Sequence, residues 1–345
     1  MKVGIVRDAI YLEHVTESFH PENPGRLRAI YGRLEAMDQA GLVYVPARVA
    51  SDEEIALNHD PAYVRFVRET KGTPQRRLDP DTVTSARSYE AACMAAGGFL
   101  ELIDACLSGK VDNGFALVRP PGHHAEAAKA MGFCIFNNCA IGARHLLKKH
   151  GYRRVMIVDF DLHHGNGTQH SFYDDPAVLY LSTHQYPYYP GTGWFDEVGE
   201  KEGKGYTINV PMTYGMNDAD YIHVFEEIVV PVSRLLRPEV VLVSAGFDIH
   251  RDDPLGGMAV SERGFARMTR ILMDIAKSEC GGKLLFVLEG GYDLEALAKS
   301  VEAVVMELKE TPIRKAEEME EDRSRAVLEA VSRAKQTLKP YWGEF

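Results

Sequence analysis

The sequence predicts an α/β fold in which a mostly parallel sheet is covered by helices on both faces. Two observations support this class: short apolar runs rich in β-branched residues recur along the chain, and longer helix-like segments lie between them. The predicted strands are residues 1–6, 114–118, 154–158, 177–181, 240–243 and 283–288. The predicted helices are residues 88–107, 138–150, 218–236 and 261–278.

The composition agrees with a chain that buries a large core. Of the 345 residues, 45% are hydrophobic, which argues against a disordered chain, and α/β enzymes of this length often form one domain. The net charge of −11 repels nucleic-acid phosphates and anionic lipid, so we expect neither nucleic acid nor a membrane as a partner. A cationic substrate is compatible with this charge.

Apolar segments and cysteines predict a cytoplasmic protein. The apolar run Val3–Val6 is too short for a signal peptide, and no later stretch is long enough to span a membrane. The five cysteines are an odd number, and none forms a Cys-x-x-Cys pair. We therefore expect reduced, mostly buried thiols.

The C-terminal part of the chain has a different character. Residues 309–325 are dense in charge, and a set of apolar residues follows at helical spacing. These residues are Val327, Val331, Ala334 and Leu338. The pattern predicts a surface helix that packs through one apolar stripe. A homo-oligomer contact between two copies of the chain is the alternative.

Polar side chains follow five of the predicted strands, at the point where each strand ends. They include the His123–His124 pair, the segment after residue 158, His184, Asp248 and Tyr292. In parallel sheets, ligands bind beyond the carboxyl ends of the strands. We therefore expect these residues to form one shared site.

Asp159, Asp161 and His163 alternate along one segment. Residues two apart in an extended chain face the same way, so their side chains are expected to converge, with Asp248 approaching from another strand. Two carboxylates and one imidazole hold Zn²⁺ and leave a position open for water. Because the donor set is harder than most zinc sites, Fe²⁺, Co²⁺ and Mn²⁺ are alternatives. In isolation, such acids more often cap helices or pair with surface bases.

His123 and His124 follow a Pro-Pro-Gly turn and are candidates for acid–base chemistry. Histidine titrates near neutral pH, so it can take a proton from a metal-activated water and return it to a leaving amine. Each ring needs a partner on its other nitrogen, for which Asp159 and Asn166 are candidates. Tyr292 follows two glycines, and its phenol is placed to donate to a tetrahedral oxyanion. Taken alone, each of these residues is as readily explained by core packing.

Six motifs together resemble the histone deacetylases and the related bacterial amidohydrolases. They are residues 119–125, 132–138, 159–168, 244–248, 253–257 and 288–292, and the resemblance runs from about residue 20 to about residue 301. It implies an arginase/deacetylase-type three-layer sandwich around an eight-stranded, mostly parallel sheet. It also implies a catalytic domain at 1–308, followed by a charged helical extension at 309–345.

The resemblance implies zinc-dependent hydrolysis of an N-acetyl or other N-acyl amine. Asp161, His163 and Asp248 would bind Zn²⁺. His124 would act as general base and acid, with His123 as its electrostatic partner, and Tyr292 would polarise the amide carbonyl. The acylated amine would be a lysine side chain or a small polyamine.

The resemblance also implies a substrate tunnel and further ion sites. The tunnel residues would be Gly132, Phe133 and Tyr189, with Leu255 near the mouth and His20 and Pro21 at the rim. Arg26 would belong to an inner acetate channel. One K⁺ or Na⁺ site would comprise Asp159, Asp161, His163, Ser182 and the carbonyl of Thr183. The other would comprise the carbonyls of Phe172, Asp175, Val178 and Tyr206.

Three residues distinguish branches of the family. Asn166 resembles the class II type, in which an amide orients the catalytic histidine. Tyr292 differs from the histidine of the poorly active class IIa enzymes and so implies catalytic activity. Leu255 is apolar, whereas the polyamine-selective member has an acidic residue near that place.

Two other functions are alternatives to deacylation, and each fits the sequence less well. A binuclear manganese ureohydrolase of the arginase type would need more carboxylate ligands, and the chain has only one Asp-x-Asp-x-His segment. A non-catalytic acyl-lysine binding module would not need His123, His124 and Tyr292 together.

Overall fold

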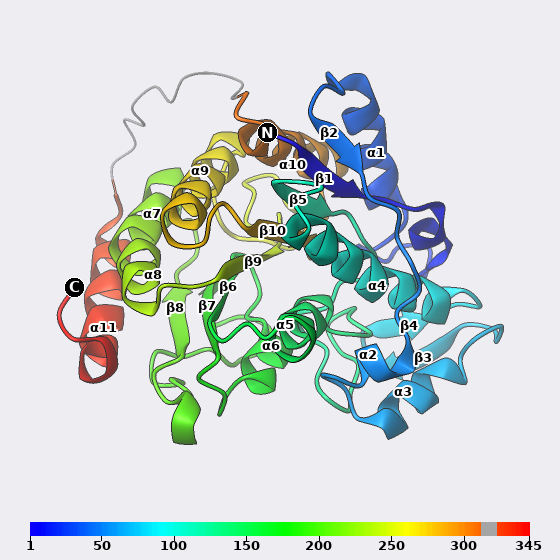
Figure 1. Ribbon diagram of the computed structural model, residues 1–345, viewed down its shortest axis with the longest axis horizontal. Coiled ribbons are helices and arrows are strands. Elements are labelled where there is room, and N and C mark those ends of the chain that lie inside the picture. The colour runs from blue at the N-terminus through cyan, green and yellow to red at the C-terminus, as the bar shows by residue number, and fades with distance from the viewer. Residues whose placement is uncertain (312–322) are drawn as a thin grey trace.

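An eight-stranded parallel sheet forms the centre of the protein. The computed structural model describes residues 1–311 and 323–345, and every neighbouring pair of strands in the main sheet is parallel (Figure 1). Across the sheet the order is β2 (Leu42–Tyr44), β1 (Val3–Val6), β5 (Asn113–Ala116), β10 (Leu284–Leu288), β9 (Val240–Ala245), β6 (Val155–Asp159), β7 (Val178–Gln185) and β8 (Thr207–Met212). The six predicted strands are confirmed with ends shifted by a few residues.

The two edge strands, β2 and β8, were not predicted. Strand β2 has three residues, and β8 contains polar residues and Pro211, so neither has the continuous apolar run of a buried parallel strand. Proline is tolerated at an edge, where one side of the strand has no partner to bond. A separate antiparallel pair, β3 (Arg76–Asp79) with β4 (Thr82–Thr84), was also missed.

Helices cover both faces of the sheet, as predicted. One layer contains α1 (Gly25–Ala36), α7 (Asp218–Val224), α8 (Val230–Leu236), α9 (Glu262–Glu279) and α10 (Leu294–Leu308), and the other contains α4 (Ser88–Leu107), α5 (Asn138–Lys149) and α6 (Asn166–Ser171). The helix predicted at 218–236 is continuous but includes a π-helical turn at Phe225–Val229. The short α2 (Asp52–Ile55) and α3 (Pro61–Arg68) lie beside the β3–β4 pair (Figure 1).

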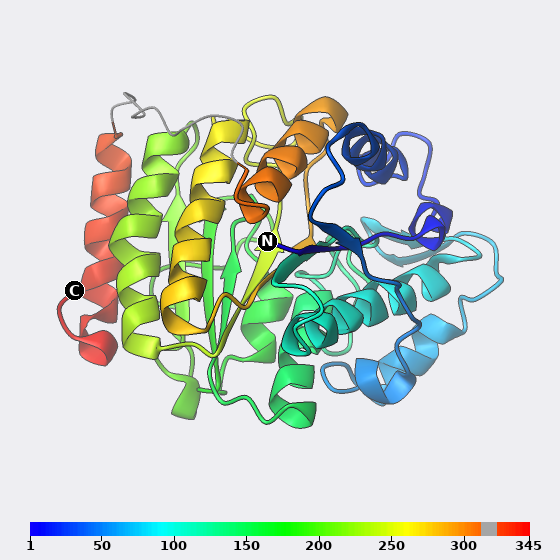
Figure 2. The same ribbon diagram turned by 45° about the horizontal axis from the view of Figure 1, so that its top comes forward.

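The helix α11 (Arg325–Trp342) begins at the last residue of the charge-dense segment, of which residues 312–322 lie outside the described part of the chain. Its predicted apolar stripe, including Val327 and Leu338, is buried. The helix contacts α7 and β8, and in Figure 2 it stands beside the α7–α8 helix, with α9 on the far side of that helix.

Two other sequence expectations concern cysteines and membrane spans. All five cysteines are buried free thiols, in agreement with the prediction. Within the described residues, no helix combines the length and apolarity needed to cross a bilayer.

Candidate metal and acid–base site

Neighbouring strands bring the predicted site residues to one edge of the sheet. Strand β6 pairs with β9, and β9 pairs with β10. The segments that follow these three strands contain Asp161, Asp248 and Tyr292. Because parallel strands all end at the same edge, residues far apart in the sequence, such as Asp161 and Asp248, leave neighbouring strands side by side.

Asp161, His163 and Asp248 meet at this edge. The Nδ1 atom of His163 lies 3.1 Å from Asp161 Oδ1 and 3.0 Å from Asp248 Oδ2. The convergence does not follow the predicted route, because β6 ends at Asp159 and the chain is no longer extended beyond it. Instead, the chain bends so that the backbone N–H of His163 donates to Asp161 Oδ1 at 2.9 Å.

Backbone donors fix the two carboxylates. The N–H of Leu162 donates to Asp248 Oδ1 at 2.9 Å, and the N–H of Gly290 donates to Asp161 Oδ2 at 2.8 Å. A Cβ atom added at Gly290 would lie 2.4 Å from Asp248 Oδ2 and one added at Gly246 would lie 2.0 Å from Asp161 Oδ2, so no side chain fits behind them. The remaining carboxylate oxygens therefore face His163.

The electrostatics of this group favour a bound cation. Burial and the charge of Asp161 raise the pKa of Asp248 to about 7. Burial lowers the pKa of His163, but hydrogen bonds to the two carboxylates outweigh it and raise the pKa to about 9. Two buried carboxylates repel each other, and a positive charge between them removes that repulsion. Two oxygens and one nitrogen are a suitable donor set for one divalent metal ion.

His123 is held by Asp159. Its Nδ1 lies 3.1 Å from Asp159 Oδ2, which also accepts a hydrogen bond from the hydroxyl of Tyr180 at 3.0 Å. Burial lowers the pKa of His123, but the charges of Asp161 and Asp159 outweigh it and raise the pKa to about 10. The structure therefore pairs this imidazole with a carboxylate, as the sequence suggested.

His124 is held by an amide instead. Its Nδ1 lies 2.8 Å from Asn166 Oδ1, and the amide nitrogen of Asn166 donates to Glu126 Oε1 at 2.5 Å. The carboxylate of Glu126 fixes the amide orientation, so Nδ1 carries the proton and Nε2 is left with its lone pair. Burial, followed by the charges of His123 and His163, lowers the pKa of His124 well below its usual value.

The segment after β10 places Tyr292 beside Asp253 and Phe133. Its backbone N–H donates to Asp253 Oδ2 at 2.6 Å, and its ring packs edge-on against Phe133 with 5.9 Å between ring centroids. Burial, with the charge of Asp248, raises the pKa of Tyr292 well above its usual value. The phenol is therefore protonated at neutral pH and can donate a hydrogen bond.

Arg26 is completely buried beneath Tyr292. Its guanidinium donates to the carbonyls of Gly291 at 2.6 Å and Glu289 at 2.5 Å, and it pairs with Glu22 at 3.2 Å. It also lies 5.1 Å from the centre of the Tyr292 ring. These contacts support the loop that carries Tyr292, and a role in an acetate channel stays a prediction.

Aromatic rings border the site on the side predicted for the tunnel. The ring of Tyr189 is 5.2 Å from that of His124, and the ring of Tyr188 stacks on His163 at 5.6 Å. The hydroxyl of Tyr188 donates to the carbonyl of Leu255 at 2.7 Å, so Tyr188 links the predicted mouth residue to His163. Tyr188 was not among the predicted substrate residues, although its neighbour was.

Phe133 and Gly132 line the opposite side of this space. His20 packs edge-on against Phe133 at 4.6 Å, and the carbonyl of Pro21 accepts a hydrogen bond from Asn23 at 3.0 Å. The rim role of His20 and Pro21 stays a prediction. A Cβ at Gly132 would lie 2.2 Å from His124 Cδ2, so only glycine lets the backbone pass this close to the imidazole.

The first set of predicted cation ligands lies around the end of β6. Asp159 Oδ1 accepts the N–H of Asp161 at 3.1 Å, and Ser182 is paired with Asp159 in the β6–β7 register. Thr183 follows Ser182 in β7. Cation binding here stays a prediction.

The second predicted set lies between α6, β7 and β8. The carbonyls of Phe172 and Asp175 accept the N–H groups of Asp175 and Val178, respectively, and the carbonyl of Tyr206 accepts that of Tyr180. Their ligand role also stays a prediction.

Two polar residues at the site were missed by sequence reasoning. Glu126 holds Asn166, and Asp81 accepts the N–H of Gly132 at 3.0 Å through Oδ1. Glu126 lies only two residues after His124, and this closeness was the available signal. Asp81 comes from the β3–β4 turn, which the apolar pattern did not reveal.

Comparisons with known proteins agree with this geometry. The family model described as the histone deacetylase domain matches residues 20–308. Histone deacetylase 15 of Arabidopsis thaliana is 43% identical over 83% of this chain and 52% of its own length. Polyamine deacetylase HDAC10 of Homo sapiens is 45% identical over 81% of this chain and 43% of its own length. The chain thus spans about half the length of these curated relatives.

Two further matches cover most of both proteins compared. A probable deacetylase of Archaeoglobus fulgidus is 40% identical over 86% of this chain and 82% of its own length. The crystal structure of the HDA15 HD domain superposes with a TM-score of 0.92 at 38% identity, covering 99% of this chain and 95% of that one. The three-layer deacetylase-type fold is therefore confirmed, and the chain belongs to the histone deacetylase family.

Proposed function

We propose that this protein is a metal-dependent deacylase that hydrolyses N-acetyl or other N-acyl amines, with acylated lysine as the first candidate substrate. The observation that supports this best is the arrangement of His124. Asn166 occupies its Nδ1, so that Nε2 is the free base, and the His163 ring lies 5.9 Å away. A base nitrogen beside a metal-ligand triad is the arrangement that metal-assisted hydrolysis needs.

Asp161, His163 and Asp248 would hold the ion. Zinc is our first choice, and Fe²⁺ or Co²⁺ would suit the same donors. When bound, such an ion acts as a Lewis acid toward an amide carbonyl and lowers the pKa of a coordinated water. The three residues contribute one donor atom each, which leaves room for the reacting groups.

His124 would move the proton. Its Nε2 accepts the proton of the attacking water and later returns it to the departing amine nitrogen. Asn166 and Glu126 keep the ring in the tautomer that can do this. His123 lies with its ring centroid 4.0 Å from that of His124 and, paired with Asp159, supplies positive charge beside the reacting groups.

Tyr292 would stabilise the developing negative charge on the carbonyl oxygen. Its raised pKa keeps the hydroxyl protonated, so it can donate to that oxygen. Removing one such donor typically costs roughly 10²–10³ in kcat. The Tyr292→Phe variant should therefore fold normally and turn over far more slowly.

Acetylpolyamines are the second candidate substrates, because one relative at 45% identity is named a polyamine deacetylase. The apolar Leu255 at the mouth offers no charge there for a second amine group, so we place acyl-lysine first. The half-buried rim residue Asp81 is compatible with either cationic substrate.

The test is a substrate panel read by amine release, with acetyl-lysine peptides, longer acyl-lysine peptides and acetylpolyamines assayed side by side. The zinc-loaded protein is compared with Tyr292→Phe and with Tyr152→Phe, which removes a phenol at the opposite edge of the sheet. We expect loss of turnover only in Tyr292→Phe. Equal turnover in both variants would contradict the role of Tyr292. Binding without product across the whole panel would favour the non-catalytic module.

A further inference from the structure

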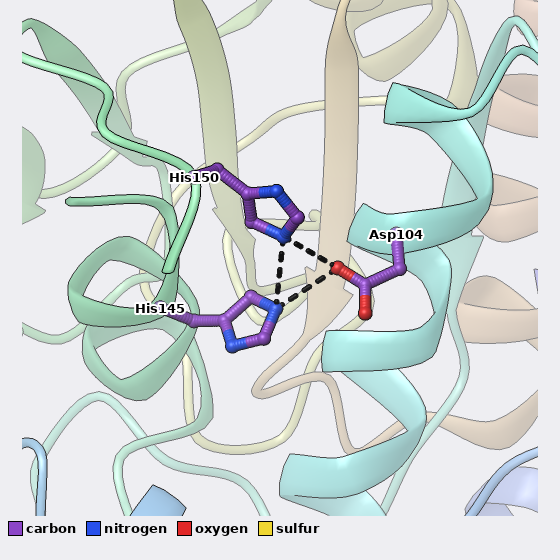
Figure 3. A group of neighbouring side chains, drawn as sticks. All are labelled: Asp104, His145 and His150. Carbon is purple, nitrogen blue, oxygen red and sulfur yellow. Dashed lines mark hydrogen bonds and ion pairs between the residues drawn. The ribbon is translucent and has the colours of Figure 1, made fainter. Parts of the chain in front are cut away.

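A second cluster of metal-ligand residues lies away from the site described above. Asp104, His145 and His150 point their side chains toward one another (Figure 3). Asp104 lies near the C-terminal end of α4, His145 lies in α5, and His150 directly follows the last residue of α5. The cluster therefore links two helices of the same layer.

Both helices reach the amino-terminal edge of the sheet at this point. Helix α5 ends at Lys149 shortly before β6 begins at Val155, and α4 ends at Leu107 shortly before β5 begins at Asn113. The groups proposed for catalysis follow the carboxyl ends of the strands. The cluster is therefore at the opposite edge, and substitutions there can be separated from catalysis.

The three ligand atoms form a small triangle. The Nε2 atoms of His145 and His150 lie 2.9 Å and 2.8 Å from Asp104 Oδ1, and they lie 3.3 Å from each other. Ligand atoms around a tetrahedral zinc ion, bound at about 2.0–2.1 Å, are roughly 3.3–3.4 Å apart. The two nitrogens already have this separation, and a shift of roughly 0.5 Å by the carboxylate completes the triangle.

Exposure and charge at the cluster also suit a metal ion. His145 is buried, with 1% of its side chain exposed, whereas His150 and Asp104 are 26% and 29% exposed. An ion can therefore enter from solvent and keep water as a further ligand. Burial lowers the pKa of His145, so its imidazole is neutral at neutral pH and has a lone pair to donate.

The carboxylate is also ionised. Burial raises the pKa of Asp104, but hydrogen bonds from His145 and His150 outweigh it and lower the pKa below its usual value. The ammonium of Lys149 lies 3.5 Å from Asp104 Oδ2. This charge opposes a bound cation, and it provides a sensitive test.

We propose that Asp104, His145 and His150 form a second binding site for a divalent transition-metal ion, with Zn²⁺ as its first candidate, that fastens the end of α5 to α4. Two imidazoles and one carboxylate favour Zn²⁺, Co²⁺, Ni²⁺ and Cu²⁺ over Mg²⁺ or Ca²⁺. An imidazole that binds the ion through Nε2 carries its ring proton on Nδ1. Because the ion binds the folded state, it raises the free energy of unfolding.

The test counts ions per chain. The full protein is equilibrated with Zn²⁺ alone, freed of unbound metal by gel filtration and analysed for zinc, alongside His150→Ala, Asp104→Asn and Asp248→Asn. We expect two ions in the unaltered protein and one in each variant. His150→Ala and Asp104→Asn should keep deacylase activity, and Asp248→Asn should lose it. Circular dichroism checks that each variant is folded.

Two further measurements address the cluster itself. Lys149→Met removes the opposing charge without removing a ligand, so it should bind the second ion more tightly than the unaltered protein. Co²⁺ added after the first site has been filled with Zn²⁺ should give a visible absorption band that His150→Ala lacks. A hydrogen-bonded clamp without a metal would give neither result.

The outcomes separate this proposal from the proposed function. One ion per chain that is lost in Asp248→Asn and kept in His150→Ala overturns the second site and leaves the deacylase proposal intact. Two ions that persist in His150→Ala also overturn it. One ion that is kept in Asp248→Asn and lost in His150→Ala supports the second site and contradicts the metal centre proposed for catalysis.

Discussion

Replacing Gly132 by alanine tests how closely the backbone must approach His124, the proposed catalytic base. A Cβ at this position would lie 2.2 Å from Cδ2 and 2.6 Å from Cγ of His124. Carbon atoms in contact prefer about 3.5–4.0 Å, so the imidazole must move by roughly 1 Å or more. Asn166 holds the ring at 2.8 Å, and this shift breaks that hydrogen bond. A misplacement of about 1 Å can cost roughly 10²-fold in rate, and we expect a loss of this size in kcat.

Gly72 provides a matched control. Both glycines have left-handed backbone conformations, with φ of +57° at Gly132 and +71° at Gly72, but a Cβ at Gly72 meets nothing within 4 Å. Each alanine therefore costs about 1–2 kcal/mol in backbone strain, and only the one at Gly132 also displaces His124. The assays are thermal unfolding and steady-state kinetics on an acetyl-lysine peptide. The reasoning is refuted if both variants lose the same stability and keep the same kcat.

Three other predictions concern Glu126, His59 and Glu22. Glu126→Ala should lower kcat by about 10-fold or more with little change in KM, because the amide of Asn166 loses the acceptor that fixes its orientation. An unchanged pH–rate profile and kcat would contradict this. Burial lowers the pKa of His59 to about 4, whereas its pKa in the unfolded state is about 6.5. Between these two pH values the unfolded state binds more protons than the folded state, so the free energy of unfolding falls as the pH falls. From pH 7 to pH 5 this group contributes a loss of about 2 kcal/mol, which His59→Gln should abolish in urea unfolding. Glu22→Gln should destabilise the protein by about 3–5 kcal/mol, because two buried arginines lose their shared carboxylate, and a loss under 1 kcal/mol would show that they find other partners.

The central strands were predictable because each corresponds to a short apolar segment that can be recognised in the sequence. Strands β6, β9 and β10 are buried along their full length, so each is a continuous apolar run with β-branched residues. The edge strand β8 contacts one neighbour and tolerates Thr207 and Pro211, which weaken the pattern by which a strand is recognised. Burial on both sides requires a continuous apolar run, which made the central strands recognisable. An edge strand does not need such a run, so the edge strands were missed.

The sequence predicted which residues form the candidate site, but it did not predict which of them contact one another. Polar residues directly after buried strands identified Asp161, Asp248 and Tyr292, since parallel strands end at one edge. The bend after Asp159 differs from the extended segment that was predicted, because backbone N–H groups turn toward the carboxylates once the strand has ended. The supporting role of Glu126 depends on which way an amide points, and spacing does not contain that information.

By itself, the sequence determined the family, the central strands and the residues that gather at the carboxyl edge of the sheet. These features follow from short segments of the chain, because a buried strand needs consecutive apolar residues and the site residues directly follow such strands. Only the tertiary structure decided which side chains touch across elements. His145 and His150 are five residues apart, a spacing that puts them on different faces of a helix, and they meet because α5 ends at Lys149 and α4 places Asp104 between them. Contacts between elements depend on how helices end and pack, and the proposed second metal site depends on these contacts.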